Sequence, residues 1–355
     1  MIAFIDLLLQ RSLIEAYKTL MKKTAQLMLS TVTIGALASL FPLPSFAEQT
    51  NRPDVSRVRF KFQNVIDRND PTFNQELGIN DFGVIAGYFG SGAAGHPNKG
   101  YTIFRHGEKF TLSDFVNENF PNSIQTQVTG INNRGGFFLG LTVTVGFWAD
   151  ANNASMVNNN FGFVNIGGQN GTFINVNNPN TGTINGIKTN QLLGINDRNI
   201  AVGFYVDTAG ATHGYTYNIE SNTYSPNIDD PNGVGATTAA AINDFDQIVG
   251  FYVDGNNVTH GFFESNGVFK TIDAVNATAT SLLGLNNFGE AVGVDMDQAK
   301  KMHGIICNVY TGETKEVDDP KGIGTTTFNG LNDLGQIVGF YVDGGGNTIG
   351  LLATP

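Results

Sequence analysis

The feature that most constrains the fold of this chain is a phrase that recurs six times. Its fullest copies read AINDFDQIVGFYVD, from Ala241, and GLNDLGQIVGFYVD, from Gly330. The copies share an asparagine, and successive asparagines lie 43 to 64 residues apart: Asn80, Asn132, Asn196, Asn243, Asn286 and Asn332. A repeat of this period predicts an array of similar supersecondary units.

Each unit is expected to hold four short strands. In the copy at residues 240–273, apolar and aromatic runs occur at 240–242, 247–253, 260–264 and 268–273, with turn sequences between them. β-Branched and aromatic residues favour strands, and Asn, Asp and Gly allow the positive φ that tight turns need. Four antiparallel strands in about 45 residues are typical of a propeller blade. The sequence therefore predicts an all-β fold, a six-bladed β-propeller of four-stranded antiparallel blades.

The strand count also predicts how the last blade is completed. The chain finishes on a third strand at 350–352, and only five fourth strands follow their third strands, ending at Asp114, Asn177, Asp229, Asp273 and Asp318. A surplus strand lies at 60–67, ahead of the first unit. We expect this N-terminal strand to complete the last blade and close the ring, which leaves only short, protected sheet edges. An open solenoid or two separate sheets would not explain why the last unit lacks one strand while one extra strand precedes the first unit.

The first 47 residues have the pattern of a secretory signal. A basic start at Met21 precedes an apolar stretch at 27–41, and the small residues Ser45 and Ala47 stand at −3 and −1 of a cleavage site. The apolar stretch is too short and too polar for a membrane anchor. We expect translation from Met21, cleavage after Ala47, and a single propeller domain at 48–355 that is secreted to a periplasm or outside the cell.

The predicted mature chain is acidic. Residues 1–47 hold four of the 20 Lys and Arg and two of the 31 Asp and Glu, so 16 basic and 29 acidic residues remain, a net charge of −13. Such a chain repels nucleic acid and anionic membrane surfaces. Cys307 is the only cysteine, so no disulfide framework is expected. We expect a monomer whose partner is an extracellular glycan or protein.

The combined motif resembles a known family. It runs G-[IL]-N-[DN]-x-G-x-[IA]-V-G-x-Y-x-D, then H-G-F, then F-x-x-I-D, and is carried by residues 194–207, 241–254 and 284–297 with the histidines His213, His260 and His303. This grammar is similar to that of the HAF family of extracellular repeat proteins. The resemblance implies a secreted bacterial repeat protein of propeller type, and it implies no particular activity.

An aspartate ends the second strand of four units, and three of these aspartates are followed six residues later by the motif's histidine. The aspartates are Asp207, Asp254, Asp297 and Asp343. They can be structural, with each Asp capping backbone N–H groups of its loop and each His bonding within or between blades. Alternatively, they gather on one acidic face and bind Ca²⁺, which takes carboxylate and carbonyl oxygens from loops. No Asp-x-Asp-x-Asp-Gly loop supports the second interpretation.

Places where the repeat is broken are better candidates for a ligand site. Trp148, the only tryptophan, stands where other units have tyrosine, and Asn152 and Asn153 follow in an Asn-rich loop. Unit one carries an insertion at 91–99 that includes His96. A tryptophan ring stacks on the C–H face of a sugar while amides bond its hydroxyls. The other interpretation is that Trp148 fills space between blades, as tyrosine does elsewhere.

Two function classes follow. The first is a secreted module that binds or interacts with a glycan or a protein, with Ca²⁺ as a candidate cofactor that assists the binding. The second is a metal-dependent hydrolase or polysaccharide lyase with its site in the central channel. No catalytic motif distinguishes the second class, and an analogy of fold alone assigns no reaction.

Overall fold

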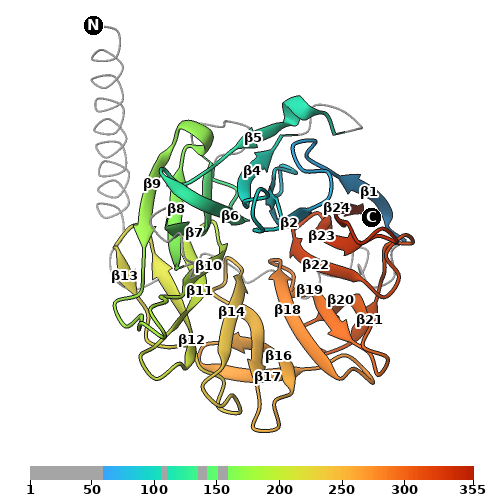
Figure 1. Cartoon of the computed structure of the whole chain (residues 1–355). Coiled ribbons are helices and arrows are strands. Elements are labelled where there is room, and N and C mark those ends of the chain that lie inside the picture. The colour runs from blue at the N-terminus through green and yellow to red at the C-terminus, as the bar shows by residue number, and fades with distance from the viewer. Residues whose placement is uncertain (1–58, 105–109, 135–141, 151–158) are drawn as a thin grey trace, which may run out of the picture. The chain divides into compact units, whose positions relative to one another are not determined.

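Six four-stranded antiparallel sheets surround a central axis (Figure 1). This computed structural model describes residues 59–104, 110–134, 142–150 and 159–355. The prediction of an all-β, six-bladed propeller is confirmed. The only helical segments in these ranges are two 3-10 turns, η3 (Leu112–Asp114) and η5 (Gly168–Asn170).

The blades follow one another along the chain. Blade 1 contains β2 (Asn74–Ile79), β3 (Ile85–Phe89), β4 (Lys99–Ile103) and β5 (Phe115–Asn117). Blade 2 contains β6 (Ser123–Ile131), β7 (Val143–Asp150), β8 (Asn160–Ile166) and β9 (Thr172–Val176). Blade 3 contains β10 (Asn190–Ile195), β11 (Ile200–Val206), β12 (Thr212–Asn218) and β13 (Thr223–Tyr224).

The second half repeats this order. Blade 4 contains β14 (Thr237–Ile242), β15 (Ile248–Val253), β16 (Thr259–Ser265) and β17 (Val268–Ile272). Blade 5 contains β18 (Ala279–Leu285), β19 (Glu290–Met296), β20 (Met302–Asn308) and β21 (Thr314–Glu316). Blade 6 contains β22 (Thr326–Leu331), β23 (Ile337–Val342), β24 (Thr348–Thr354) and β1 (Lys61–Val65).

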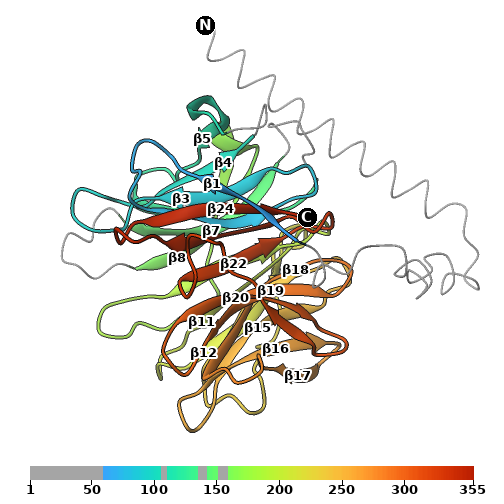
Figure 2. The ribbon, with the colours of Figure 1, turned by 90° about the vertical axis from the view of Figure 1, so that its right-hand side faces the viewer.

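Blade 6 combines strands from the two ends of the described chain. β1 pairs antiparallel with β24, with Val65 opposite Gly350. In Figure 2, β1 and β24 lie side by side. Phe62 of β1 also stacks on Phe328 of β22, with ring centroids 6.5 Å apart.

Two predicted strand ends are wrong. In blade 3 the fourth strand, β13, ends at Tyr224 and not at Asp229, and an isolated bridge between Gly214 and Ile228 follows it. The fourth strand of blade 1 does not end at Asp114. That residue ends the turn η3, where its carboxylate accepts the backbone N–H of Thr111 at 2.6 Å. The fourth strand is β5, which pairs with β4 through Tyr101 and Asn117. In the sequence, an aspartate that caps its own turn cannot be distinguished from an aspartate at the end of a strand.

Close approach of backbones explains the repeated glycines. Each hairpin between the first and second strands has a register shift, as between Ala239 and Ala241 in blade 4. A Cβ at Gly250 would overlap the carbonyl oxygen of Thr238 across that hairpin. At the axis, a Cβ at Gly78 would lie 3.1 Å from the Cα of Gly130 in the next blade. Glycine therefore lets the innermost strands of neighbouring blades pack against one another.

The hydrophobic core lies between neighbouring blades. One cluster joins Val145 and Val164 of blade 2 to Leu192 and Tyr215 of blade 3, and none of these side chains is exposed. In antiparallel blades of this order, the turns between first and second strands lie on one face of the ring. The connections between second and third strands, and between blades, lie on the other face. The molecule therefore offers two distinct faces to ligands.

Candidate functional site

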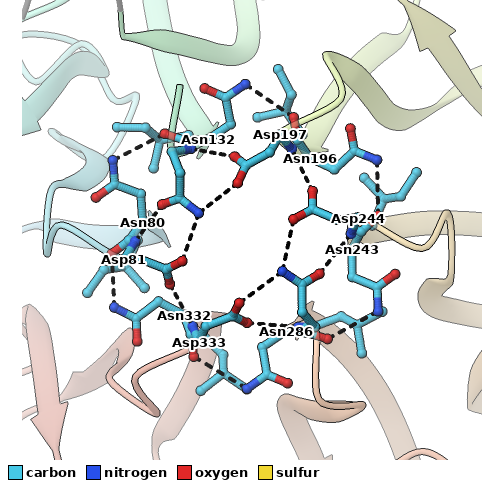
Figure 3. Close-up of a pocket in the computed structure, with 18 residues that line it drawn as sticks. Asn80, Asp81, Asn132, Asn196, Asp197, Asn243, Asp244, Asn286, Asn332 and Asp333 are labelled. Atoms are coloured by element: carbon cyan, nitrogen blue, oxygen red, sulfur yellow. Dashed lines mark hydrogen bonds between the residues drawn. The ribbon is translucent and has the colours of Figure 1, made fainter. Parts of the chain in front are cut away.

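The six repeated asparagine turns meet at the axis and line a cavity of about 90 Å³ (Figure 3). Each blade contributes the last apolar residue of its innermost strand, the shared asparagine and the residue after it. Because the innermost strands converge, residues as far apart in sequence as Asp81 and Asp333 become neighbours.

The shared asparagines form the first ring of hydrogen bonds. The side-chain amide of each donates to the backbone carbonyl of the equivalent asparagine in the next blade, at distances of 2.9–3.4 Å. The side-chain oxygen meanwhile accepts backbone N–H groups of its own turn. For Asn243 the donors are Phe245 and Gln247, both at 3.1 Å. Each asparagine therefore shapes its turn and joins two blades.

The following residues form a second ring closer to the cavity. Each backbone N–H donates to the side-chain Oδ1 of its counterpart in the next blade, at 2.6–2.9 Å. The ring consists of Asp81, Asn133, Asp197, Asp244, Asn287 and Asp333. Four carboxylates thus face one small cavity, and each also serves as a link between blades.

The two amides of this ring lie on opposite sides. Asn133 donates to the carboxylates of Asp81 and Asp197 at 2.8 and 2.9 Å. Asn287 bridges Asp244 and Asp333 in the same way, both at 2.9 Å. Burial raises the pKa of Asp81 and of Asp197, and neighbouring carboxylates raise both further. The cavity therefore attracts groups that donate hydrogen bonds or carry positive charge.

The next residue of each turn follows the ring position in sequence and does not line the cavity. One arc carries apolar side chains, of which Phe82, Phe245 and Leu334 are 41%, 43% and 60% exposed. Blades 2 and 3 carry arginines instead. Arg134 pairs with Glu220 at 3.3 Å, and Arg198 pairs with Asp246 at 2.6 Å. The mouth of the channel thus combines a carboxylate centre with an apolar rim on one side.

None of the residues of this site was predicted from the sequence. The predicted binding residues lie elsewhere, and only the alternative of a hydrolase or lyase put a site in the central channel, without naming residues for it. The available signal was the residue after each asparagine, which is acidic in four of six copies. Its meaning depends on the convergence of six innermost strands, a property of the closed ring.

The strand-ending aspartates cap their own loops on that opposite face. Oδ1 of Asp254 accepts the backbone N–H groups of Asn256 and Val258, each at 2.9 Å, and these bonds lower its pKa. Asp207, Asp297 and Asp343 do the same in their blades. No three His, Cys, Asp or Glu side chains in the described ranges are arranged to hold a metal ion.

The repeated histidines lie between two carboxylates. In blade 4, His260 Nδ1 lies 2.8 Å from Asp273, and its Nε2 lies 3.7 Å from Asp254. Burial lowers the pKa of His260, but the hydrogen bonds and charges of the two carboxylates outweigh it, so the pKa is raised. His213 and His303 have the same surroundings. We call these arrangements histidine clamps.

Trp148 takes the place of the repeat tyrosine in β7. Its indole stacks on Phe120, with centroids 4.2 Å and planes 3° apart, and its Nε1 donates to Asn175 at 3.1 Å. A hollow of about 30 Å³ lies beside it, lined in part by Gln125 and Asn160. Stacking of a sugar on the face that Phe120 covers would require that phenyl ring to move.

The other candidates beside Trp148 are only partly described. Asn152 and Asn153 lie outside the described residues. His96 contacts Asp70, with Nδ1 and Oδ2 2.7 Å apart. The unit-one insertion also reaches β6, because Gln127 donates to Asn98 at 3.0 Å. This insertion therefore lies next to the strand that lines the Trp148 hollow.

No family model matches the chain, and no curated protein matches it. Solved structures do. A protein of unknown function from Dyadobacter fermentans has a TM-score of 0.54 and 10% identity, over 82% of this chain and 99% of that one. AofleA from Arthrobotrys oligospora has a TM-score of 0.50 and 10% identity, over 84% and 86%. A six-bladed fungal lectin from Aleuria aurantia has a TM-score of 0.44 and 10% identity, over 76% and 86%.

At these identities the comparisons show the fold alone. Within the described ranges, no helix has the length and apolar character needed to cross a membrane. The chemistry of the chain's own cavities must therefore carry any functional argument.

Proposed function

We propose that this chain is a binding module that holds an extracellular glycan at the mouth of its central channel. The observation that carries the proposal is the ring of four carboxylates facing one cavity, on turns of which two also carry a partly exposed phenylalanine. Export through the predicted signal, and kinship with the HAF repeat proteins, belong to the same proposal. They rest on the signal pattern at 21–47 and on the repeat grammar.

The chemistry of the mouth suits a sugar. Sugar hydroxyls donate to carboxylate oxygens, and Asp81, Asp197, Asp244 and Asp333 present such oxygens. The C–H faces of sugar rings pack on aromatic rings, which Phe82 and its counterparts supply at the rim. A cavity of about 90 Å³ accepts the tip of a ligand, so the rest of a longer glycan would lie across the rim.

The ring provides its own isosteric test. Asn already occupies two of the six positions, at Asn133 and Asn287, and its Oδ1 accepts the neighbouring backbone N–H there. A variant with Asp81→Asn, Asp197→Asn, Asp244→Asn and Asp333→Asn therefore keeps the Oδ1 acceptors of the backbone N–H groups and loses the four charges. It also replaces the Oδ2 acceptors of the Asn133 and Asn287 amides by NH2 groups. Val275→Ala, a 74% exposed position in a connection between blades on the opposite face, is the matched surface control.

The experiment screens the protein of residues 48–355 against a polysaccharide panel, and then measures affinity by calorimetry. We expect one glycan class to bind, with at least about a tenfold loss of affinity in the all-asparagine ring, since each hydrogen bond to a charged group is worth about 1.5–3 kcal/mol. Val275→Ala should bind as the unmodified protein does.

Three results would overturn the proposal. Loss of binding on Trp148→Ala, with the all-asparagine ring unaffected, would place the site in blade 2. Absence of any glycan binding, together with stable capture of an envelope protein, would identify a protein-binding module. Cleavage of the bound glycan that stops in chelator would instead favour the metal-dependent hydrolase or lyase.

A further inference from the structure

An exposed tyrosine stands next to the cavity, where blades 4 and 5 meet. Tyr310 lies in the turn between β20 and β21 and is 47% exposed. Its hydroxyl donates to Oε1 of Gln247 at 3.2 Å, and the side-chain amide of Asn243 donates to the same oxygen at 2.9 Å. Asn243 lines the cavity at the axis (Figure 3). Two consecutive hydrogen bonds therefore connect the phenol group with the cavity wall.

The ring of Tyr310 is held in one orientation. It packs against the backbone of Gly289, where an added Cβ would overlap Cε2 of the ring. An edge-to-face contact with Phe263 places the ring centroids 6.0 Å apart, with the planes at 82°. Nζ of Lys270 donates to the carbonyls of Val309 and Tyr310, at 3.0 and 2.8 Å, and so fixes the turn itself. A ring that is fixed before binding and still exposed loses little conformational freedom when a ligand stacks on it.

Blades 2 and 3 place an ion pair where blades 4 and 5 place two aromatic rings. Tyr310 and Glu220 are equivalent, because in both turns the preceding residue donates its backbone N–H to the carbonyl of the third residue after the shared asparagine of that blade. Phe245 and Arg134 are equivalent as well, each two residues after its own shared asparagine. Glu220 and Arg134 form an ion pair at 3.3 Å. Phe245 and Tyr310, both partly exposed, therefore border the same stretch of surface between two blades.

The groups at this place suit a sugar ring. The C–H face of a sugar packs on an aromatic side chain, and its hydroxyls bond to amide and phenol groups at the edge of that contact. Phe245 and Tyr310 supply the rings, and Gln247 supplies an amide between Tyr310 and the cavity. The phenol lies no more than two hydrogen-bond lengths from the Asn243 amide. A glycan that occupies the cavity with one residue can therefore reach Tyr310 with the next.

We propose that Tyr310 and Phe245 form a second sugar subsite, which binds the residue next to the one held at the axis. The inference rests on the proposed glycan site and gives the bound chain a direction, outward over blades 4 and 5. The equivalent turns of blades 2 and 3 carry Arg134 and Arg198, both held in ion pairs. Rings joined through equatorial bonds suit the subsite, because they present flat C–H faces to aromatic side chains. The ligand is therefore an oligosaccharide or polysaccharide of this kind.

The test uses chitin and cellulose oligosaccharides, from the single sugar to the tetramer, with the protein of residues 48–355. In at least one of the two series, calorimetry should give an affinity at least about fivefold higher for the dimer than for the single sugar. Tyr310→Ala should remove most of this difference, because the second ring of the dimer loses its stacking partner. The affinity of Tyr310→Ala for the single sugar should stay unchanged, which would show that the variant is folded and that the site at the axis is intact.

Three further variants separate the ring from its surroundings. Tyr310→Phe removes the hydrogen bond to Gln247 and should keep most of the difference between dimer and single sugar, because the ring still stacks. Glu220→Ala truncates the equivalent turn residue of blade 3 and should bind both sugars as the unmodified protein does. The all-asparagine ring should weaken the binding of every sugar in the series, the single sugar included.

Three outcomes would reject the subsite. If Tyr310→Ala keeps the preference for the dimer while the all-asparagine ring loses binding, the subsite is wrong and the site at the axis stands. If Tyr310→Ala weakens the binding of the single sugar and of the dimer equally, Tyr310 only supports the packing around the cavity. Absence of binding by both series overturns the subsite as proposed, whereas the glycan site at the axis is rejected only if every member of the polysaccharide panel fails to bind.

Discussion

Asn332 in blade 6 donates its side-chain amide to the backbone carbonyl of Asn80 in blade 1, with Nδ2 and O 2.9 Å apart. The oxygen of the same side chain accepts the backbone N–H groups of Leu334 and Gln336. One residue therefore shapes a turn and joins the last blade to the first. The same bond between neighbouring blades recurs around the axis.

Replacement of Asn332 should measure the strength of this link. Asn332→Ala removes the bond to Asn80 and both turn bonds, so we expect a loss of about 2–4 kcal/mol in the free energy of unfolding. Asn332→Asp keeps the turn acceptor and loses the donor to Asn80. Its free energy of unfolding should therefore lie between those of Asn332→Ala and the unmodified protein. Urea unfolding measures both. Equal stability of Asn332→Asp and the unmodified protein would show that the link between blades contributes nothing.

The histidine clamps should make stability depend on pH. The pKa of each clamped histidine is raised above its usual 6.5, so the clamps contribute fully below pH 6.5 and lose their contribution as pH rises through the folded pKa. Each clamp should contribute only weakly to stability, because its carboxylates are exposed to solvent and screened. A variant with His213→Gln, His260→Gln and His303→Gln should be less stable at pH 6 and show a flatter profile. If the stability of the variant and that of the unmodified protein change in parallel from pH 5.5 to 8.5, the clamped histidines do not cause the pH dependence.

Asp295 should destabilise the folded protein at neutral pH. It replaces the repeat tyrosine of β19, is 2% exposed, and its Oδ1 has no hydrogen-bond partner in the described ranges. Burial, and then the charge of Glu316, raise its pKa to about 6. The folded state therefore holds the proton more tightly, and stability falls as pH rises from about 4 to 6.

Asp295→Asn should remove that penalty. We expect a gain of about 1–2 kcal/mol at pH 7, less than the full shift implies because Glu316 is exposed to solvent, and no gain near pH 4. Thermal or urea unfolding at the two pH values measures it. A loss of stability at pH 7 would mean that the carboxylate has a partner which the substitution removes.

The architecture was predictable because it repeats. Period, strand count and turn residues all point to the same six units, and local propensity agrees with the closed fold at each of them. Strand ends were less predictable. β14 begins at Thr237, three residues before the expected 240, because its threonines are buried despite being polar.

The site at the axis was not predictable from any single unit. Asp81 and Asp333 have unremarkable turn sequences, and only the ring brings their side chain and backbone within 2.8 Å. The surroundings of Tyr310 were equally hidden, since Gln247 comes from the preceding blade. The sequence of one unit predicts the strands and turns of that unit, whereas contacts between side chains of neighbouring units depend on how the blades pack in the ring.

A crystal structure of the protein with the oligosaccharide that binds it most tightly would locate the binding site directly. We expect the sugar at the axis, with hydroxyls bonded to carboxylates of Asp81, Asp197, Asp244 or Asp333 and a ring face against Phe82 or Phe245. A sugar bound beside Trp148 or among the loops of the opposite face, with the channel mouth empty, would contradict it.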